Sequence, residues 1–168
     1  MTLTAPTGTT QTMGAALLAL GMAVTVGTAL GFQHIGGYIP CKLCLEQRLP
    51  YYVGVPVAVL ALLAAAFRLP PLVVRGLLLA VALLMTWSIW LGGFHSGVEW
   101  GWWPGPSDCG VVVVPEGSGS LLDQLDFAIP PSCDEAAGRF LGLSFAGWNV
   151  VASVALAAIA YVAAFRKA

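Results

Sequence analysis

The four cysteines are the residues of this sequence best suited to chemistry. Cys41 and Cys44 form a Cys-x-x-Cys motif between two long apolar stretches, whereas Cys109 and Cys133 lie in a long polar segment further along the chain. Thiols spaced like the first pair form a disulfide that is easily made and broken, and the thiolate is the form that exchanges. Four cysteines allow three pairings, of which we expect Cys41 with Cys44 and Cys109 with Cys133. The pattern predicts redox chemistry between dithiols and a lipid-soluble partner.

We expect two further polar residues to support this chemistry. Arg48 follows Cys44 by one helical turn if a helix begins there, and a helix N-terminus would itself lower the pKa of the Cys44 thiol. A cation in the first turn is disfavoured by the helix dipole, so Arg48 should face an anion, such as the Cys44 thiolate or a reduced acceptor. The simpler alternative is that Arg48 only anchors the helix at the lipid headgroups. His95, like His34, ends an apolar stretch, where it is either an interfacial residue or a proton carrier.

The wide cysteine pair also admits a purely structural interpretation. A disulfide between Cys109 and Cys133 would stabilise the fold by about 3 kcal/mol through loop closure alone. The Cys-x-x-Cys motif in the same chain favours a relay between the two pairs instead. A zinc site is disfavoured because Cys109 and Cys133 are far apart and no histidine pattern accompanies them, so we expect no metal.

The rest of the chain supplies helices that hold these residues in a membrane. Of its 168 residues, 58% are hydrophobic and 9% are charged, and the mean hydropathy is +0.86. Soluble domains carry about 25% charged residues, and no basic cluster indicates nucleic-acid binding. Four uncharged stretches of about 20 residues can each cross the hydrocarbon layer as a helix. We predict one all-α membrane domain, 1–168, a four-transmembrane-helix bundle with a long loop between helices 3 and 4. The spans are residues 13–32, 49–67, 76–94 and 144–165, and the loops on the cysteine side are residues 33–48 and 95–143.

The charges are divided unevenly between the connections. Arg68 and Arg75 lie between the second and third spans, Arg166 and Lys167 follow the fourth, and all eight acidic residues fall in the other two connections. The positive-inside rule therefore places both termini in the cytoplasm. Every cysteine is then on the outer side, where disulfides persist. Within the first span, the glycines of a Gly-x-x-x-Gly motif are spaced for close helix contact.

Together these residues resemble the DsbB disulfide-bond formation proteins of bacterial inner membranes. The resemblance covers essentially the whole chain, and the segments that carry it are residues 32–34, the run from Pro40 to Arg48, His95, the Cys109/Cys133 loop and residues 140–143. It implies an enzyme that reoxidises a soluble, periplasmic thioredoxin-like dithiol oxidase (DsbA-type) and passes the electrons to a membrane quinone, ubiquinone or menaquinone. The vitamin K epoxide reductase group fits less well, because its quinone-facing Cys-x-x-Cys comes late in the chain.

The resemblance also implies roles at the quinone end of the relay. Cys44 would face the quinone, with Cys41 as its disulfide partner. Arg48 would help to hold the quinone and its developing negative charge, and His95 would lie near it. The protein would sit in the bacterial inner (cytoplasmic) membrane with its cysteine-bearing loops in the periplasm.

At the other end of the relay, Cys109 would be attacked by the soluble oxidase. Cys133 would then pass the oxidation state to Cys41. Two positions depart from the family pattern: Lys42 stands where an apolar residue is usual, and Gln47 where an acid is common. Two alternatives stay open, a relative that oxidises a dedicated client and a non-enzymatic membrane scaffold or subunit with two structural disulfides.

Overall fold

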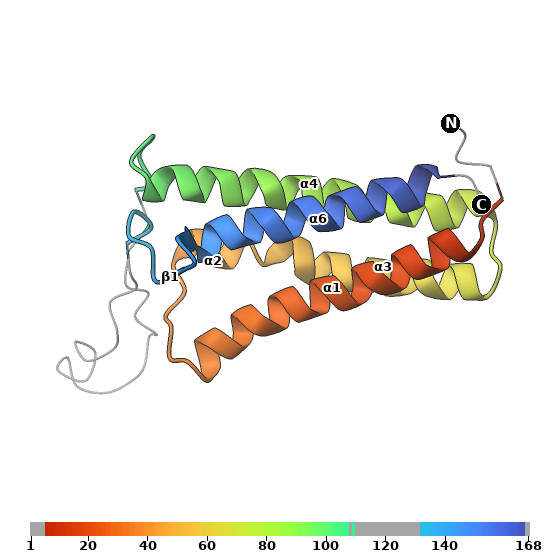
Figure 1. Cartoon of the computed structure of the whole chain (residues 1–168), viewed down its shortest axis with the longest axis horizontal. Helices are drawn as coiled ribbons and strands as arrows, with labels where there is room; N and C mark the ends of the chain where they lie inside the picture. The colour runs from red at the N-terminus through yellow and green to blue at the C-terminus, as the bar shows by residue number, and fades with distance from the viewer. Residues whose placement is uncertain (1–5, 108, 110–131, 167–168) are drawn as a thin grey trace, which may run out of the picture.

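The protein is a bundle of four long helices. This computed structural model describes residues 6–107, 109 and 132–166. Within that part of the chain, the helices long and apolar enough to cross a membrane are α1 (Thr9–His34), α3 (Leu49–Ala66), α4 (Pro71–Glu99) and α6 (Phe145–Phe165) (Figure 1). Helices α1 and α4 each pack against both α3 and α6, which closes the bundle. The predicted four-transmembrane-helix fold is confirmed.

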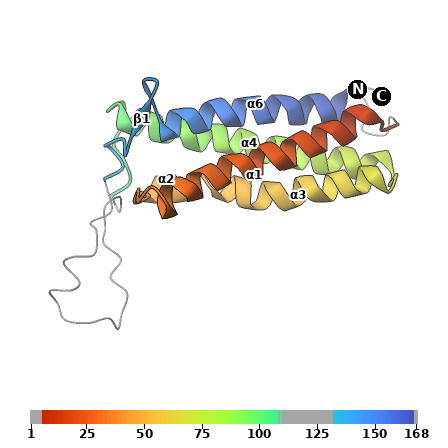
Figure 2. The same ribbon diagram turned by 60° about the horizontal axis from the view of Figure 1, so that its bottom comes forward.

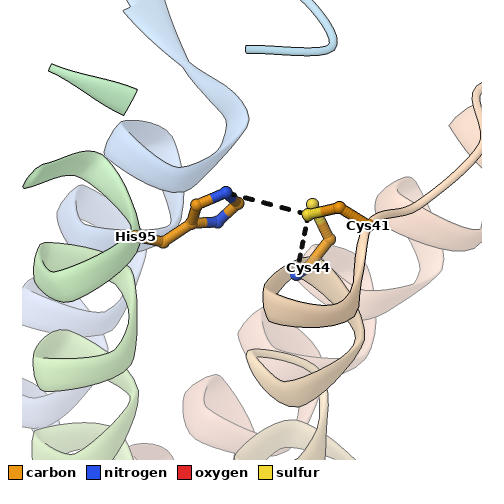
Figure 3. Close-up of side chains that lie close together, drawn as sticks. All are labelled: Cys41, Cys44 and His95. Carbon is orange, nitrogen blue, oxygen red and sulfur yellow. Dashed lines mark hydrogen bonds between the residues drawn. The ribbon is translucent and has the colours of Figure 1, made fainter. Parts of the chain in front are cut away.

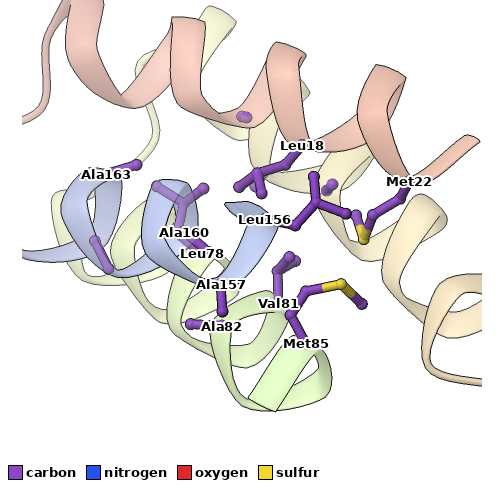
Figure 4. Close-up of a cluster of buried hydrophobic side chains, with 14 of the residues drawn as sticks. Leu18, Met22, Leu78, Val81, Ala82, Met85, Leu156, Ala157, Ala160 and Ala163 are labelled. Atoms are coloured by element: carbon purple, nitrogen blue, oxygen red, sulfur yellow. The ribbon is translucent and has the colours of Figure 1, made fainter. Parts of the chain in front are cut away.

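Small side chains let the helices approach closely at the centre of the bundle. The fully buried side chains mix alanines with larger apolar residues, among them Ala58, Ala61, Ala82, Ala160, Leu18, Met22, Leu78, Val81 and Met85 (Figure 4). Gly14 of α1 faces α6 so closely that a Cβ there would lie 2.6 Å from the Cβ of Ala163. Helix association in lipid depends on such close van der Waals contact.

The Gly-x-x-x-Gly motif of α1 does not make the close contact that its spacing suggested. In the described part of the chain, nothing lies within 4 Å of a Cβ built on Gly27 or Gly31. Gly14 takes that role instead, nearer the start of α1.

The outside of the bundle is apolar as well as the inside. Large hydrophobic side chains stay exposed along the helices, among them Leu20, Leu60, Leu83, Trp90 and Val154. An apolar surface of this extent is an aggregation liability in water but is well solvated by hydrocarbon. The exterior therefore fits a bundle surrounded by lipid.

Arg75 holds one end of the bundle together. It is fully buried (0% exposed), and its guanidinium donates hydrogen bonds to the carbonyl oxygens of Ala164 (2.6 Å), Arg166 (3.0 Å) and Pro6 (2.9 Å). These bonds satisfy carbonyl groups that the end of α6 leaves without helical partners. They also bring the two ends of the described chain side by side, whereas helix α2 (Lys42–Glu46), which directly follows Cys41, lies at the opposite end (Figure 2).

The observed helices differ from the predicted spans mainly at the ends of α4. This helix runs from Pro71 to Glu99, beyond the predicted 76–94, so Arg75 and His95 lie inside a helix rather than in the connections. The prediction relied on uncharged stretches, but both side chains are buried with hydrogen-bond partners and do not interrupt the helix. Helix α1 is also longer than the predicted 13–32, and α3 and α6 each differ from their predicted span by one residue.

Short elements fill the connections at the cysteine end. Helix α2 (Lys42–Glu46) lies within the predicted loop 33–48. Strands β1 (Arg139–Phe140) and β2 (Leu143–Ser144) form an antiparallel hairpin. Its two turn residues, Leu141 and Gly142, have φ values of 52° and 83°, as a two-residue type I′ turn requires. Ser144 then caps α6 by accepting a hydrogen bond from the Gly147 N–H (3.2 Å).

Candidate functional site

The Cys-x-x-Cys motif is positioned by the start of α2. Cys41 is the N-cap residue, and its Sγ accepts a hydrogen bond from the backbone N–H of Cys44 (3.3 Å). Cys41 is 4% exposed, and Cys44 is half-buried. Both are free thiols, in contrast to the disulfide that we expected between them. The inner pair is therefore described here as a reduced dithiol.

His95 reaches the inner pair from α4. Its Nε2 lies 3.7 Å from the Cys41 Sγ, and the ring is 2% exposed (Figure 3). On the other side of the ring, Nδ1 lies 2.7 Å from the Gln47 Nε2, which also donates to the Leu43 carbonyl oxygen (3.3 Å). A carbonyl only accepts, so the amide group facing Leu43 must be the NH₂. His95 Nδ1 is then the acceptor, and the ring proton sits on Nε2, directed at Cys41.

These contacts make Cys41 the anionic sulfur of the pair. A hydrogen bond from the Cys44 side chain, opposed by burial and supported by His95, lowers the pKa of the Cys41 thiol to about 5. From the sequence we expected the thiolate at Cys44, because α3 was taken to begin the helix. In the structure the separate helix α2 begins one residue after Cys41, so the donors at its start serve that sulfur.

A buried polar network continues from Gln47 into the bundle. The Gln47 Oε1 accepts from the Asn149 Nδ2 (2.9 Å), and the Tyr51 hydroxyl donates to the Asn149 Oδ1 (2.7 Å). Tyr51 also contacts the Ser153 hydroxyl (2.8 Å), which donates to the Ser88 hydroxyl (2.8 Å). Buried polar groups in a bundle need such partners. The network fixes the Gln47 amide and, through it, the ring of His95.

Sequence reasoning missed this network apart from His95 and the identity of Gln47. The only signal was polar residues inside apolar windows, with Asn149 in the fourth span as the clearest case. An intramembrane polar residue is a functional hypothesis by default, although the partners of Asn149 could not be named without the fold.

The second cysteine pair is a disulfide and lies against the first pair. Cys109 and Cys133 are bonded, with their Cα atoms 5.6 Å apart, as expected. Cys133 is 1% exposed and belongs to a buried cluster with Cys41, Leu43 and Val98, against which Cys44 and Cys109 pack. Residues far apart in the sequence are thus brought into one group of four sulfurs. An oxidised pair in contact with a reduced pair is suited to thiol–disulfide exchange.

Arg48 lies at the start of α3, as predicted, but its contact is with another helix. Its guanidinium is half-buried and donates a hydrogen bond to the side-chain oxygen of Gln33 in α1. The amide oxygen is a neutral acceptor, so the cation keeps its charge available. This leaves Arg48 able to face an anion, which stays a prediction.

A small cavity opens beside the thiols. Its lining includes Cys41, Cys44, His95 and Glu99, together with Phe145 and Ala146 at the start of α6 and Glu135 and Ala137 from the segment before β1. The ligand atoms of the two cysteines and His95 lie within 4.8 Å of one another. They offer three ligands, one fewer than a structural zinc site uses. The absence of a metal therefore stays a prediction.

Comparison with known proteins gives these features a family context. The chain matches the family model DsbB, described as disulfide bond formation protein DsbB, over residues 11–163. It is 31% identical to disulfide bond formation protein B of Aromatoleum aromaticum, over 89% of this chain and 92% of that protein. It is 28% identical to the protein of the same name in Polaromonas sp., over 91% and 90%, and 27% identical to the uncharacterized protein RP370 of Rickettsia prowazekii, over 79% and 76%. No solved structure matches the chain.

Proposed function

The chain belongs to the DsbB family of disulfide bond formation proteins, and on that basis we propose that it is a protein dithiol:quinone oxidoreductase. It reoxidises a soluble, periplasmic thioredoxin-like dithiol oxidase (DsbA-type) and delivers the electrons to a membrane quinone. The observation that carries the proposal is the buried cluster in which Cys133 of the loop pair meets Cys41 of the Cys-x-x-Cys pair. Two pairs in contact at one end of a membrane bundle provide a route from a soluble protein to a lipid-soluble acceptor.

Successive exchanges account for every atom and electron of this route. A partner thiolate attacks Cys109, and once the partner's disulfide has formed, Cys109 and Cys133 are thiols. Cys133 next attacks Cys41 of the oxidised inner pair, and Cys109 resolves that bond. The outer disulfide is restored, and Cys41 and Cys44 are left reduced. An outer disulfide beside an inner dithiol is the arrangement that this step would produce.

The residues around Cys44 fit a quinone, which would be ubiquinone or menaquinone. A quinone needs apolar surface for its ring and donors for its carbonyl oxygens. Leu45 and Leu49, which flank the half-buried Arg48 in the sequence, have exposed apolar side chains. When bound, the quinone supplies the acceptor for two electrons and two protons. Arg48 would orient it and balance negative charge, Cys44 would face it, and His95 would hold its proton on Nε2 beside Cys41.

The proposed location is the bacterial inner membrane, with both termini cytoplasmic and the cysteines periplasmic. Arg75 hydrogen-bonds the carbonyl oxygens of Pro6 and Arg166 at one end of the bundle, and the cysteines lie at the other. The positive-inside rule supports this orientation. An oxidising compartment on the cysteine side would let both pairs cycle.

Quinone reduction by the purified protein tests the proposal. The full chain in detergent is given a reduced thioredoxin-like oxidase and a soluble quinone, and the loss of the quinone ultraviolet band is followed. We expect Cys44→Ser and Cys109→Ser each to abolish reduction by the protein substrate. Ser132→Ala, next to Cys133 but exposed, is the matched control and should keep the wild-type rate.

Cys109→Ser should still reduce quinone when a small dithiol such as dithiothreitol feeds the inner pair directly. This arm separates the two ends of the relay, because Cys44→Ser should fail with either donor. Wild-type protein that never reduces quinone would favour the structural alternative, a scaffold with two disulfides.

A further inference from the structure

Glu99 is a buried carboxyl group beside the inner dithiol. It ends α4, one turn after His95, and its side chain is 4% exposed. Its Oε1 lies 3.8 Å from the His95 Nε2, and no group in the described part of the chain hydrogen-bonds its Oε2. Glu99 lines the same cavity as both thiols and is close enough to Cys44 for their charges to interact.

The buried Oε2 of Glu99 destabilises the fold unless it accepts a hydrogen bond or a proton. Leaving a buried polar atom unpaired costs about 1–3 kcal/mol, and more for a charged group. The titratable residues that line the cavity together with Glu99 are Cys41, Cys44, His95 and Glu135. Glu135 is exposed and acidic, and the single His95 Nε2–H is directed at Cys41. In the reduced pair the Cys44 thiol donates its hydrogen bond to the Cys41 sulfur, so its proton becomes available to Glu99 only as the S–S bond forms.

We propose that Glu99 is the proton acceptor for Cys44 when the inner dithiol is oxidised. The inference deepens the proposed function and rests on it. Cys41 enters the reaction as a thiolate and Cys44 as a thiol, so one S–H bond breaks at Cys44 as the S–S bond forms. The electron pair passes to the quinone. The Cys44 proton passes to Glu99 and from there to the reduced quinone, which takes its second proton from water.

This role explains why α4 presents two polar residues, His95 and Glu99, on one face. Residues four apart on a helix are neighbours, so Glu99 and His95 both face the inner pair from α4. His95 stabilises the Cys41 sulfur through its Nε2–H. Its other ring nitrogen, Nδ1, already accepts a hydrogen bond from Gln47, so the ring has no free nitrogen to take the Cys44 proton. Glu99 is then needed for the proton that His95 cannot take.

The experiment compares Glu99→Gln with wild type in the full chain, over a range of pH. Quinone reduction fed by dithiothreitol isolates the inner pair from the loop pair. We expect the Gln variant to be about 100-fold slower at neutral pH, as for loss of a general base. Its rate should climb about tenfold per pH unit as hydroxide replaces the carboxylate, while wild type changes little. Glu99→Asp should recover part of the rate, since it restores the base.

Glu135→Gln is the matched control, because it removes the other carboxylate of the same cavity and should leave the rate and its pH profile unchanged. Oxidation of the reduced inner pair by glutathione disulfide, followed by mass spectrometry of alkylated Cys41 and Cys44, gives a second readout without quinone. We expect Glu99→Gln to slow this reaction as well. If wild type reduces no quinone, the proposed function fails, yet this second readout still decides the role of Glu99.

Two results would overturn the inference. One is a Glu99→Gln variant that matches wild type at every pH in the glutathione assay. The other is an equal loss at every pH in Glu99→Gln and Glu99→Asp, because a merely structural carboxylate would behave in that way. Retention of the Cys109–Cys133 disulfide and of the melting temperature shows that a slow variant is folded.

Discussion

At the scale of single residues, the site is organised around the Cys41 sulfur. It receives the Cys44 backbone N–H and faces the His95 Nε2, and burial alone would have disfavoured its charge. A stabilised thiolate is a good leaving group, so a disulfide bond to Cys41 breaks readily when another thiol attacks the sulfur bonded to Cys41. This suits a sulfur that must accept and release Cys133 in every cycle of the proposed relay.

The reactivity of Cys41 should be nearly independent of pH in the neutral range. Because the pKa of its thiol is about 5, the reactive thiolate is lost only as the pH falls through that value. We expect alkylation of the reduced inner pair by iodoacetamide, read by peptide mass spectrometry, to show a Cys41 midpoint near pH 5. His95→Leu should move the midpoint upward. A wild-type midpoint near pH 9 would contradict the stabilised thiolate.

The tautomer of His95 should depend on Gln47. Gln47→Glu replaces the NH₂ donor with an acceptor, so a proton must sit on Nδ1. We expect ¹⁵N NMR of labelled histidine to show protonation on Nε2 alone in wild type and on Nδ1 in the variant. The exposed His34 provides the internal control, since its signals should not change.

At the scale of elements, sequence and structure agree where apolar length decides the outcome. The central parts of all four spans follow from uncharged stretches, because backbone in lipid must form helix. The ends of α4 and the start of α2 did not follow, because they depend on partners from other helices. Arg75 and His95 look like boundary residues until the carbonyl groups of α6 and the Gln47 amide are in place.

The same reason limits what could be predicted of the site. The four cysteines, Arg48 and His95 were found from residue type and spacing, and the structure brings the cysteines and His95 together. Asn149 could not be assigned, because hydrogen bonds between helices depend on how they rotate against each other. Which of the two sulfurs is the thiolate depends on the residue at which α2 begins, and the sequence alone did not locate that start.

The contact between α1 and α6 should be sensitive to one methyl group. At Gly14 a Cβ would lie 2.6 Å from the Cβ of Ala163, so Gly14→Ala forces the helices apart and should cost about 1–3 kcal/mol. Thermal unfolding in detergent measures the loss. Gly27→Ala is the control in the same helix, with free space at its Cβ position, and should be neutral or slightly stabilising.

At the scale of the whole molecule, the bundle separates an end that anchors from an end that reacts. Arg75 ties the two chain ends and α6 together, while α2 and the end of α4 meet at the cysteines. The proposed exchange between the two cysteine pairs would take place at the end opposite the Arg75 contacts. The exposed apolar exterior keeps this axis perpendicular to the membrane plane.

The orientation predicts which end an impermeant reagent can reach. Single cysteines introduced at the exposed Leu69, between α3 and α4, and at the exposed Trp102, after α4, report opposite sides. In intact cells whose outer membrane is permeabilised, a charged maleimide should label the Trp102 position and not the Leu69 position. Equal labelling before lysis, or the reverse pattern, would overturn the proposed orientation.

The burial of Cys133 has a consequence for how the oxidising power of the proposed relay is protected from small thiols. Of the bonded pair, only Cys109 is partly accessible, while Cys133 is buried within the cluster. A small thiol can attack the loop disulfide only at Cys109, and the buried Cys133 thiol then displaces it from the mixed disulfide. A docked protein that keeps its second thiol in place can complete the exchange. The packing around Cys133 thus insulates the loop disulfide, and electrons would pass through it only when a docked protein completes the exchange.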